Sequence, residues 1–456
     1  MIANLKPYPQ YRQAVSQWIG HVPTHWTVRN LRTLLAPRSE RNRIDLPLLS
    51  VAREKGVFIR SLTNPDENHN VIPEDLSNYK VARAGDLVIN KMKAWQGSMG
   101  IAPVDGIVSP AYFVYNISIE NRQFAQKLLR SKSYIAHFAQ ASDGVRIGQW
   151  DLSISGMKNI SVVIPPPSEQ ADIVRFLDWA SSRLERAIRA KRKVIALLNE
   201  QKQAIIHRAV TRGLDPTVRF KDSGIPWLGE IPEHWVLSPN RALLRIRKVL
   251  VGSRHPRFQL LSLTKRGVIV RDMTELRGKF SSDMGTSQEV RVGDLIFCLF
   301  DVPETPRTVG LSRFAGMITG AYTVMECSDP EIAKFLELYY IAMDDRKLLG
   351  PLYSGLRNTI PKDRFMGMKT PIPPAIERKA ILASIEERTT SINASISRLE
   401  REIELLQEYR TRLVSDVVTG KLDVRDAAGR IPEEAKSEEI AEDELAGADE
   451  DEETEE

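Results

Sequence analysis

A second copy of Trp18-Ile19-Gly20-His21-Val22-Pro23-Thr24-His25-Trp26 begins at Trp227 and reads Trp227-Leu228-Gly229-Glu230-Ile231-Pro232-Glu233-His234-Trp235. Further segments recur in the same order at a nearly constant spacing of about 208 residues: Gly85-Asp86-Leu87 as Gly293-Asp294-Leu295, Gly156-Met157-Lys158 as Gly367-Met368-Lys369, and Ile164-Pro165-Pro166 as Ile372-Pro373-Pro374. Such ordered matches indicate one unit present twice, and the period is far too long for a solenoid repeat. Two copies predict two similar modules related by an approximate twofold axis.

The composition of this 456-residue chain, with 42% hydrophobic residues, allows about three domains with real cores. Cys298 and Cys327 form no CxxC pair, which favours a reduced, cytoplasmic chain without structural zinc. The amino-terminal residues contain no apolar targeting segment, and no run approaches about 18 apolar residues. We therefore expect a cytoplasmic protein that does not span a membrane.

The net charge of +5 divides into two opposite parts. Residues 431–456 hold 14 acidic residues and one lysine, a net charge of −13, whereas the other 430 residues hold 63 Lys and Arg against 45 Asp and Glu, a net charge of +18. A body this basic indicates a polyanionic partner, most simply nucleic acid, with a generic basic protein as the alternative. We expect the end of the chain to be a disordered acidic tail, because it has too few aromatic residues to fold alone. A solubility tag is the simpler account of this tail, and DNA mimicry is the alternative.

Each half of the chain divides into a mixed part and a helical part. Short β-rich runs at 85–89, 111–115 and 161–164 are separated by Gly, Pro, Asn and Asp, and brief helical segments are expected at 124–138 and 332–343. This pattern predicts an α+β domain with an irregular sheet. The prolines at 165–167 and 373–374 end each mixed part. The next stretches, to Thr211 and to Thr419, contain no proline or glycine, so each predicts a helix of roughly 65 Å.

Both predicted helices carry a coiled-coil pattern. Apolar residues recur at heptad spacing, and we expect this seam to contain Leu177, Leu184, Ile188, Ile195, Leu198, Ile205, Ile385, Ile392, Ile396, Leu399, Ile403, Leu406 and Leu413. Lys191, Lys202 and Arg410 interrupt it. The simplest arrangement packs the two helices against each other as an antiparallel coiled coil, and the alternative gives each helix a separate partner.

No catalytic motif is present in the sequence. It has no Walker phosphate loop, no GxGxxG after a strand, no HExxH and no GxSxG, so we expect no catalytic residue and no metal ligand. His25 and His234 lie inside the repeated motif and are interpreted as packed structure. Asp86 and Asp294 are repeated acids, but each begins a strand after glycine, where a turn role is more common.

The two halves differ where a reader of two different targets is expected to differ. Residues 90–96 (Asn-Lys-Met-Lys-Ala-Trp-Gln) stand opposite 297–303 (Phe-Cys-Leu-Phe-Asp-Val-Pro) between matching flanks. DNA bases are read by side chains with particular donor and acceptor patterns. Our candidates for base readout are Lys91, Lys93, Trp95, Gln96, Arg146, Gln149, Arg307, Arg357, Asn358 and Lys362. Our candidates for phosphate contacts are Arg53, Lys55, Lys265 and Arg266, and for each residue the alternative is an ordinary surface side chain.

These motifs together resemble the specificity subunit of type I restriction–modification systems. The resemblance rests on the two W-[IL]-G-x-[IV]-P-x-H-W copies, each followed by Gly-Asp-Leu, a Pro-Pro-x-x-E turn and a long helix, and on Phe220-Lys221-Asp222-Ser223-Gly224-Ile225-Pro226-Trp227-Leu228-Gly229. It covers nearly everything from Tyr8 to Asp423. It implies two target-recognition domains with pseudo-twofold symmetry, divided as an amino-terminal segment (1–15), domain 1 (16–163), spacer 1 (164–212), a linker with domain 2 (213–371), spacer 2 (372–423) and a tail (424–456).

The resemblance also implies a division of labour. Proteins of this family read a bipartite double-stranded DNA site and have no activity alone. They recruit two methylation subunits, which bind S-adenosylmethionine, and two restriction subunits, which use ATP and magnesium, so this chain is expected to bind no cofactor itself. The alternatives are the specificity chain of a modification-only or type IIB-like system, and a non-catalytic coiled-coil scaffold with two protein-binding domains.

Overall fold

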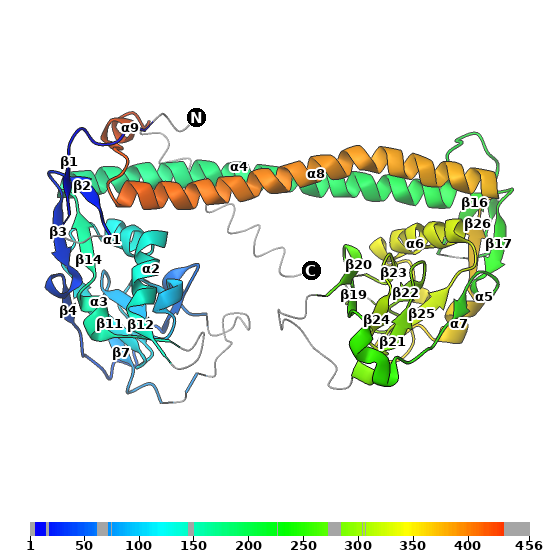
Figure 1. The fold of residues 1–456 in the computed structure, drawn as a ribbon, viewed down its shortest axis with the longest axis horizontal. Coiled ribbons are helices and arrows are strands. Elements are labelled where there is room, and N and C mark those ends of the chain that lie inside the picture. The colour runs from blue at the N-terminus through cyan, green and yellow to red at the C-terminus, as the bar shows by residue number, and fades with distance from the viewer. Residues whose placement is uncertain are drawn as a thin grey trace. The chain divides into compact units, whose positions relative to one another are not determined.

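The computed structural model describes residues 5–14, 18–61, 72–73, 75–144, 150–225, 227–271, 284–302, 304–305 and 307–432 (Figure 1). The chain forms two compact units, of which unit 1 comprises residues 1–191 and 401–456, and unit 2 comprises residues 192–400. Unit 1 is therefore discontinuous in sequence, and a simple tandem order of two domains is not confirmed. The predicted domain boundaries and the pseudo-twofold axis stay predictions.

Each unit is built on the same four-stranded antiparallel sheet. In unit 1 the strand order is β4 (Leu35–Pro37), β11 (Tyr112–Ile117), β8 (Leu87–Asn90) and β9 (Met99–Ile101). In unit 2 it is β18 (Arg245–Ile246), β25 (Thr323–Glu326), β22 (Leu295–Phe297) and β23 (Val309–Leu311). The identical order confirms the duplication that the sequence predicts, and the mixture of helix and sheet confirms the α+β character.

Two-stranded pairs surround each sheet. Unit 1 contains β1 (Tyr11–Gln13) with β2 (His21–Pro23), β3 (Thr27–Asn30) with β14 (Ser161–Ile164), β5 (Leu49–Ala52) with β6 (Gly56–Ile59), β7 (Lys80–Ala82) with β10 (Gly106–Val108), and β12 (Ser142–Asp143) with β13 (Asp151–Leu152). Unit 2 contains β15 (Phe220–Asp222) with β16 (Glu230–Pro232), β17 (Val236–Pro239) with β26 (Lys369–Ile372), β19 (Leu261–Thr264) with β20 (Gly267–Val270), and β21 (Gln288–Val290) with β24 (Gly316–Ile318).

Short helices complete both units. Unit 1 has η1 (Leu31–Thr33), η3 (Ala94–Gln96), α1 (Arg122–Leu129), α2 (Lys132–Gln140), α3 (Ile154–Lys158) and α9 (Arg425–Gly429). Unit 2 has α5 (Asn240–Leu243), η4 (Gly252–Arg257), η5 (Met284–Thr286), α6 (Pro330–Asp345), η6 (Gly350–Leu352) and α7 (Lys362–Gly367). The helix predicted at 332–343 is confirmed as α6. The one predicted at 124–138 is wrong as a single helix, because Ser131 takes an extended backbone (ψ 150°) between α1 and α2.

The central strands β8 and β22 are buried along their whole length because both faces of each sheet are covered. In β8, Ile89 joins the main core of unit 1 while Val88 joins a second core beneath the hairpins. In β22, Phe297 joins the main core of unit 2 while Ile296 joins the corresponding second core. Alternate residues of a strand point to opposite faces, so every position is buried.

The repeated aspartates stabilise the turn just before the central strand of each sheet. Asp86 accepts the backbone N–H of Arg83 at 2.9 Å and pairs with the Arg38 guanidinium, whose Nη2 lies 3.0 Å from Oδ1. Asp294 likewise accepts from the backbone N–H of Arg291 and pairs with Arg247. The turn role predicted for these acids is therefore confirmed, and each also forms an ion pair with the arginine just after the edge strand of its sheet, Arg38 after β4 or Arg247 after β18.

Two long helices extend from the mixed parts (Figure 1). These are α4 (Pro167–Arg212) and α8 (Ala375–Val418), close to the predicted ends, and they pack together within each unit. In unit 1 Lys191 Nζ lies 2.6 Å from Glu402 Oε2, and Arg410 pairs with Glu185. In unit 2 Lys202 Nζ lies 2.7 Å from Asn393 Oδ1. Later residues of one helix meet earlier residues of the other, so the packing is antiparallel.

The same contacts explain the polar residues in the heptad pattern. Lys191, Lys202 and Arg410 each find a polar partner on the opposite helix, so the three interruptions are cross-helix pairs. Such pairs fix the register of helices that apolar contacts alone would leave free to slide. The thirteen seam residues named above are all buried or half-buried, from Leu177 at 0% exposure to partly exposed Ile195.

The repeated His-Trp pair binds the repeated glutamate at the start of each long helix. In unit 1 Glu169 accepts from Trp26 Nε1 at 3.0 Å, from Tyr8 Oη at 2.6 Å and from His25 at 2.7 Å. In unit 2, Glu377 contacts His234 at 2.6 Å and Trp235 Nε1 at 3.1 Å. The two motifs therefore recur together because they form one contact that joins the mixed part to its helix.

The two ends of the described chain meet in unit 1. The backbone N–H of Asp423 donates to the Lys6 carbonyl at 2.8 Å, and Tyr11 Oη donates to the Gly420 carbonyl at 3.1 Å. Val424 and Ala428, on α9 or beside it, are completely buried. The prediction of a disordered tail from residue 424 is thus wrong for 424–432, because these apolar side chains complete the core; residues 433–456 lie outside the described chain.

One of the sequence matches joins positions that are not equivalent. Ile160 and Met368 occupy the same place, since their carbonyls accept the backbone N–H of Leu31 and Asn240 at 2.9 Å and each precedes the equivalent strand. By that register Gly156-Met157-Lys158 lies in α3, whereas Gly367-Met368-Lys369 crosses from α7 into β26. The match of Gly156-Met157-Lys158 with Gly367-Met368-Lys369, which is three residues out of this register, was therefore wrong.

Candidate nucleic-acid interface

In unit 1 the predicted reading loop packs against the β12–β13 hairpin. The loop follows β8, and Lys91 Nζ lies 3.0 Å from Asp151 Oδ2 while its carbonyl accepts the N–H of Leu152 at 2.9 Å. Trp95 stands with its ring centroid 5.1 Å from that of Trp150 and donates to the Met92 carbonyl at 3.1 Å. Two candidates for base readout are thus held at the base of the hairpin. Arg146 and Gln149, which are also predicted to read bases, lie outside the described residues.

In unit 2 the equivalent loop packs against the turn at 354–359. The N–H of Ile360 donates to the Leu299 carbonyl at 2.8 Å, which repeats the contact between Leu152 and Lys91. The Asp301 carboxylate accepts from Nε of Arg357 at 3.1 Å and also pairs with its Nη2. The hydrogen bonds lower the pKa of Asp301 and raise that of Arg357. Arg357 and Asn358 are both exposed, and Lys362 is exposed at the start of α7.

The candidates for phosphate contacts occupy equivalent hairpin tips. Arg53 and Lys55 lie between β5 and β6, and Lys265 and Arg266 lie between β19 and β20. All four are exposed. Lys55 Nζ stands 5.4 Å from the Phe58 ring centroid, and Arg53 lies 3.5 Å from Glu54. Equivalent exposed cations on a shared scaffold suit contacts that position a duplex without reading its sequence.

A cavity of about 760 Å³ in unit 1 collects several of these side chains. Arg53, Trp95 and Gln96 line it together with cationic residues that the sequence analysis missed, namely Arg130, Lys132 and Arg410. Arg130 Nη2 donates to the carbonyls of Arg53 and Glu54 at 2.8 Å, and burial lowers its pKa. No sequence signal pointed to Arg130 and Lys132, because no glycine or proline marks the break between α1 and α2 on either side of which they lie.

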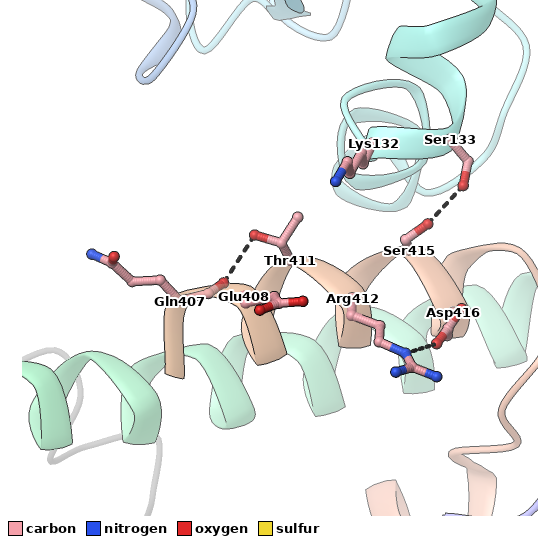
Figure 2. A pocket seen from close by; sticks show the side chains of 8 residues that line it. All are labelled: Lys132, Ser133, Gln407, Glu408, Thr411, Arg412, Ser415 and Asp416. Atoms are coloured by element: carbon pink, nitrogen blue, oxygen red, sulfur yellow. Dashed lines mark hydrogen bonds and ion pairs between the residues drawn. The ribbon is translucent and has the colours of Figure 1, made fainter. Parts of the chain in front are cut away.

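A second, polar cavity of about 480 Å³ lies between α2 and α8 (Figure 2). It shares Lys132 and Thr411 with the first. Ser133 Oγ and Ser415 Oγ, which both line it, lie 2.8 Å apart, and Figure 2 shows this bond between α2 and α8. The mixed part of unit 1 is thus tied to α8 by a polar contact beside the cationic cavity.

The remaining readout candidates are placed differently. Arg307 Nη1 lies 2.6 Å from Asp345 Oδ1 on α6, and its side chain is only 17% exposed, which favours a structural ion pair. Lys93 is exposed and precedes η3. The structure therefore brings together Lys91 and Trp95 in unit 1 and Arg357 and Asn358 in unit 2, and leaves Arg307 apart. Asp301, which holds Arg357, was quoted within the divergent loop but not recognised, because sequence patterns do not pair residues 56 positions apart.

The described residues contain no group of three or more His, Cys, Asp or Glu side chains arranged to hold a metal ion. Among the same residues, no helix has the length and apolar character needed to cross a bilayer. Burial raises the pKa of the Cys298 thiol to about 11, so this cysteine is an unreactive core residue.

The chain is similar to solved structures of restriction–modification proteins. A chain from a structure on complex assembly and conformational transition of the type I restriction–modification system superposes with a TM-score of 0.56 at 14% identity, covering 88% of this chain and 99% of that one. The fold is that of a type I restriction–modification chain. This confirms, at the level of the fold, the resemblance that the repeated motifs predict.

Two further solved structures that this chain resembles are described as specificity subunits. The HsdS subunit from Thermoanaerobacter tengcongensis covers 88% of this chain and 98% of its own, with 15% identity and a TM-score of 0.45. The type I S subunit from M. genitalium covers 91% and 99%, with 11% identity and a TM-score of 0.34. No protein-family model matches the sequence.

Proposed function

We propose that this chain is the specificity subunit of a type I restriction–modification complex, in which each unit reads one half of a bipartite DNA site. One observation carries the proposal. The two units share a scaffold down to individual backbone hydrogen bonds, yet present different charged side chains from the same loops: Lys91 with Asp151 in one, Asp301 with Arg357 in the other. Different side chains on one scaffold are what two readers of different sequences require.

Charge and fold support the same function. The body outside residues 431–456 carries +18, which suits a polyanion, and exposed cations sit at equivalent hairpin tips in both units. The similar chain from the type I restriction–modification structure aligns over most of this chain and nearly all of its own length. Methylation of a base requires that the base leave the stack, so a reader positions the duplex while a partner performs the chemistry.

The proposal assigns catalysis to partner subunits. In it, this chain binds no cofactor. Two methylation subunits bring S-adenosylmethionine and two restriction subunits use ATP and magnesium. The isolated chain incubated with DNA, S-adenosylmethionine and magnesium should therefore neither methylate nor cut. Activity of the pure chain would overturn the assignment.

A methylation map tests the proposal. The chain is expressed with the methyltransferase encoded beside it in a host free of DNA methylation, and the genome is sequenced for N6-methyladenine. One split motif with two defined halves around a fixed gap is expected. A soluble complex without new methylation would favour the non-catalytic scaffold, whose DNA affinity would also lack a steep salt dependence. Methylation without any restriction activity would identify a modification-only system, and cutting beside the site a type IIB-like one.

A further inference from the structure

The turn at residues 354–359 in unit 2 is closed by backbone hydrogen bonds and is largely exposed to solvent. Ser354 and Thr359 exchange backbone hydrogen bonds of 2.8 and 3.0 Å. Between them Gly355 has a φ of 71° and Asn358 a φ of 42°, backbone conformations that close the turn tightly. Leu356 at the tip is completely exposed. A constrained turn that projects side chains away from the core is suited to contact a partner molecule.

The neighbouring loop fixes both the backbone and the side chain of Arg357. The N–H of Asp301 donates to the Arg357 carbonyl at 2.9 Å, while the Asp301 carboxylate accepts from the guanidinium. The guanidinium carbon also lies 5.7 Å from the Phe300 ring centroid. Asp301 itself holds a φ of 45°, which is uncommon for a residue with a side chain. Strain of this kind persists where the surroundings enforce it.

The ion pair uses one particular edge of the guanidinium. The Asp301 carboxylate accepts hydrogen bonds from Nε and Nη2, which form the side-on edge of the guanidinium. Among the described residues, no hydrogen bond from Nη1 of Arg357 is found, and the side chain remains 71% exposed. The end-on edge, formed by Nη1 and the second N–H of Nη2, therefore points two parallel donors toward solvent. Guanine O6 and N7 form the acceptor pair in DNA that matches two such donors.

The charge of the pair separates base readout from phosphate binding. Asp301 offsets the charge of Arg357 and would lie close to any group that the free edge binds. The carboxylate would repel a phosphate, which carries a full negative charge, more strongly than the uncharged guanine edge. The arrangement thus favours a base over the backbone.

We infer that Arg357 reads a guanine in the half-site of unit 2 and that Asp301 is its positioning residue. The inference deepens the proposed function and rests on it. Lys91 and Asp151 form an ion pair between the same two loops of unit 1, but at other positions of those loops, so the two units need not read the same base.

The test uses the full chain with its methyltransferase partner and measures the methylated motif. Arg357→Ala and Arg357→Lys should each relax one guanine position of one half-site by about ten- to a hundredfold, because lysine keeps the charge but not the two-donor fork. Asp301→Asn should relax the same position by roughly three- to tenfold, since it frees the guanidinium to reorient. The other half-site, unchanged in every variant, shows that the protein is folded.

Arg291→Ala is the matched control. Its guanidinium is 62% exposed and donates through Nε to Glu289 at 3.1 Å, and it lies outside the turn, so the motif should not change. If Arg357→Lys retains full discrimination, or Arg357→Ala weakens all sequences equally, the residue contacts phosphate and the inference is overturned. An effect of Asp301→Asn at a different base would also overturn it. Absence of a split motif for the unaltered protein would instead remove the proposed function.

Discussion

The reading loops of the two units follow equivalent strands and share one backbone hydrogen bond, but they carry opposite charges. In unit 1 the loop after the central strand supplies Lys91 and the hairpin supplies Asp151; in unit 2 the loop supplies Asp301 and the turn supplies Arg357. The hydrogen bonds from Leu152 to Lys91 and from Ile360 to Leu299 are the same in both. The scaffold therefore fixes where side chains are presented, and the loop sequence alone decides what is presented.

The strongest test of this comparison exchanges a whole mixed part. Replacing residues 16–163 with the equivalent region of a relative should change one half of the methylated motif completely and leave the other half and the gap intact. The reason is that residues 16–163 all belong to unit 1. Sequencing of methylated genomic DNA measures the result, and simultaneous change of both halves would contradict independent readers.

The next test compares the two contacts that hold the long helices. Glu169→Ala should destabilise unit 1 by about 3–5 kcal/mol, because it leaves buried Tyr8 and Trp26 donors unpaired. Glu377→Ala should cost unit 2 only about 1–3 kcal/mol, because Glu377 has two donors and is 23% exposed. Hydrogen exchange with mass spectrometry resolves the opening free energy of each unit.

A control on the same helix sharpens that measurement. Glu185→Ala removes an exposed carboxylate that pairs with Arg410, and exposed pairs contribute about 0–1 kcal/mol. Equal losses for Glu169→Ala and Glu185→Ala would show that the His-Trp contact does not stabilise unit 1.

A smaller effect is expected at the loop of unit 1. Lys91→Ala should relax discrimination in the half-site that Arg357→Ala leaves unchanged, at a cost of about 1 kcal/mol, since lysine offers a single charged donor group. Lys158→Ala, an exposed lysine on α3, serves as the control. The methylated motif again provides the measurement, and relaxation of the unit 2 half-site by Lys91→Ala would contradict the assignment of loops to halves.

The smallest expected difference between the two units is the loss of stability at low pH. Burial lowers the pKa of His207 on α4, and Arg346 and Arg212 lower it further. Because the folded state favours the neutral ring, its contribution to stability is complete above about pH 6.5 and is lost as the pH falls below that value. The loss should stay below about 1 kcal/mol, since the ring is partly exposed to solvent.

The comparison with unit 1 supplies the control for this pH effect. The equivalent helix position there is Ser415, so His207→Ser should remove the acid-dependent loss from unit 2. Burial also lowers the pKa of His137 in unit 1, whose acid response should remain. Hydrogen exchange at pH 5.5 and 7.5, corrected for intrinsic rates, measures both units in one experiment. A persistent response of unit 2 in the His207→Ser variant would contradict the assignment.

Local sequence patterns predicted the parts of the fold that local physics decides. The ends of α4 and α8, the seam from Leu177 to Leu413, and the turn role of Asp86 all depend on periodicity or on neighbours within a few residues. The break between α1 and α2 was missed because no glycine or proline marks it. The match of Gly367 to Gly156 failed because similar letters crossed an element boundary.

The candidate site was less accessible to sequence reasoning. Arg357 is exposed, as expected for an arginine in a loop, but its partner Asp301 comes from another loop. Arg307 was also a candidate for base readout, but it lies in a half-buried ion pair with Asp345. Whether a loop cation faces solvent or a carboxylate is decided by tertiary packing, which composition and spacing do not encode.

The meeting of the two chain ends has a consequence for how such a protein can be assembled. In unit 2, α4 continues through Gly213 directly into β15, whereas in unit 1 the end of α8 reaches the strand β1 only through contacts such as Asp423 with Lys6. One junction is covalent and the other is not, yet they occupy equivalent places. Non-covalent contacts alone therefore suffice to hold the end of a long helix beside the first strands of a mixed part. A single ancestral half, paired with itself, would have needed no peptide link at either junction.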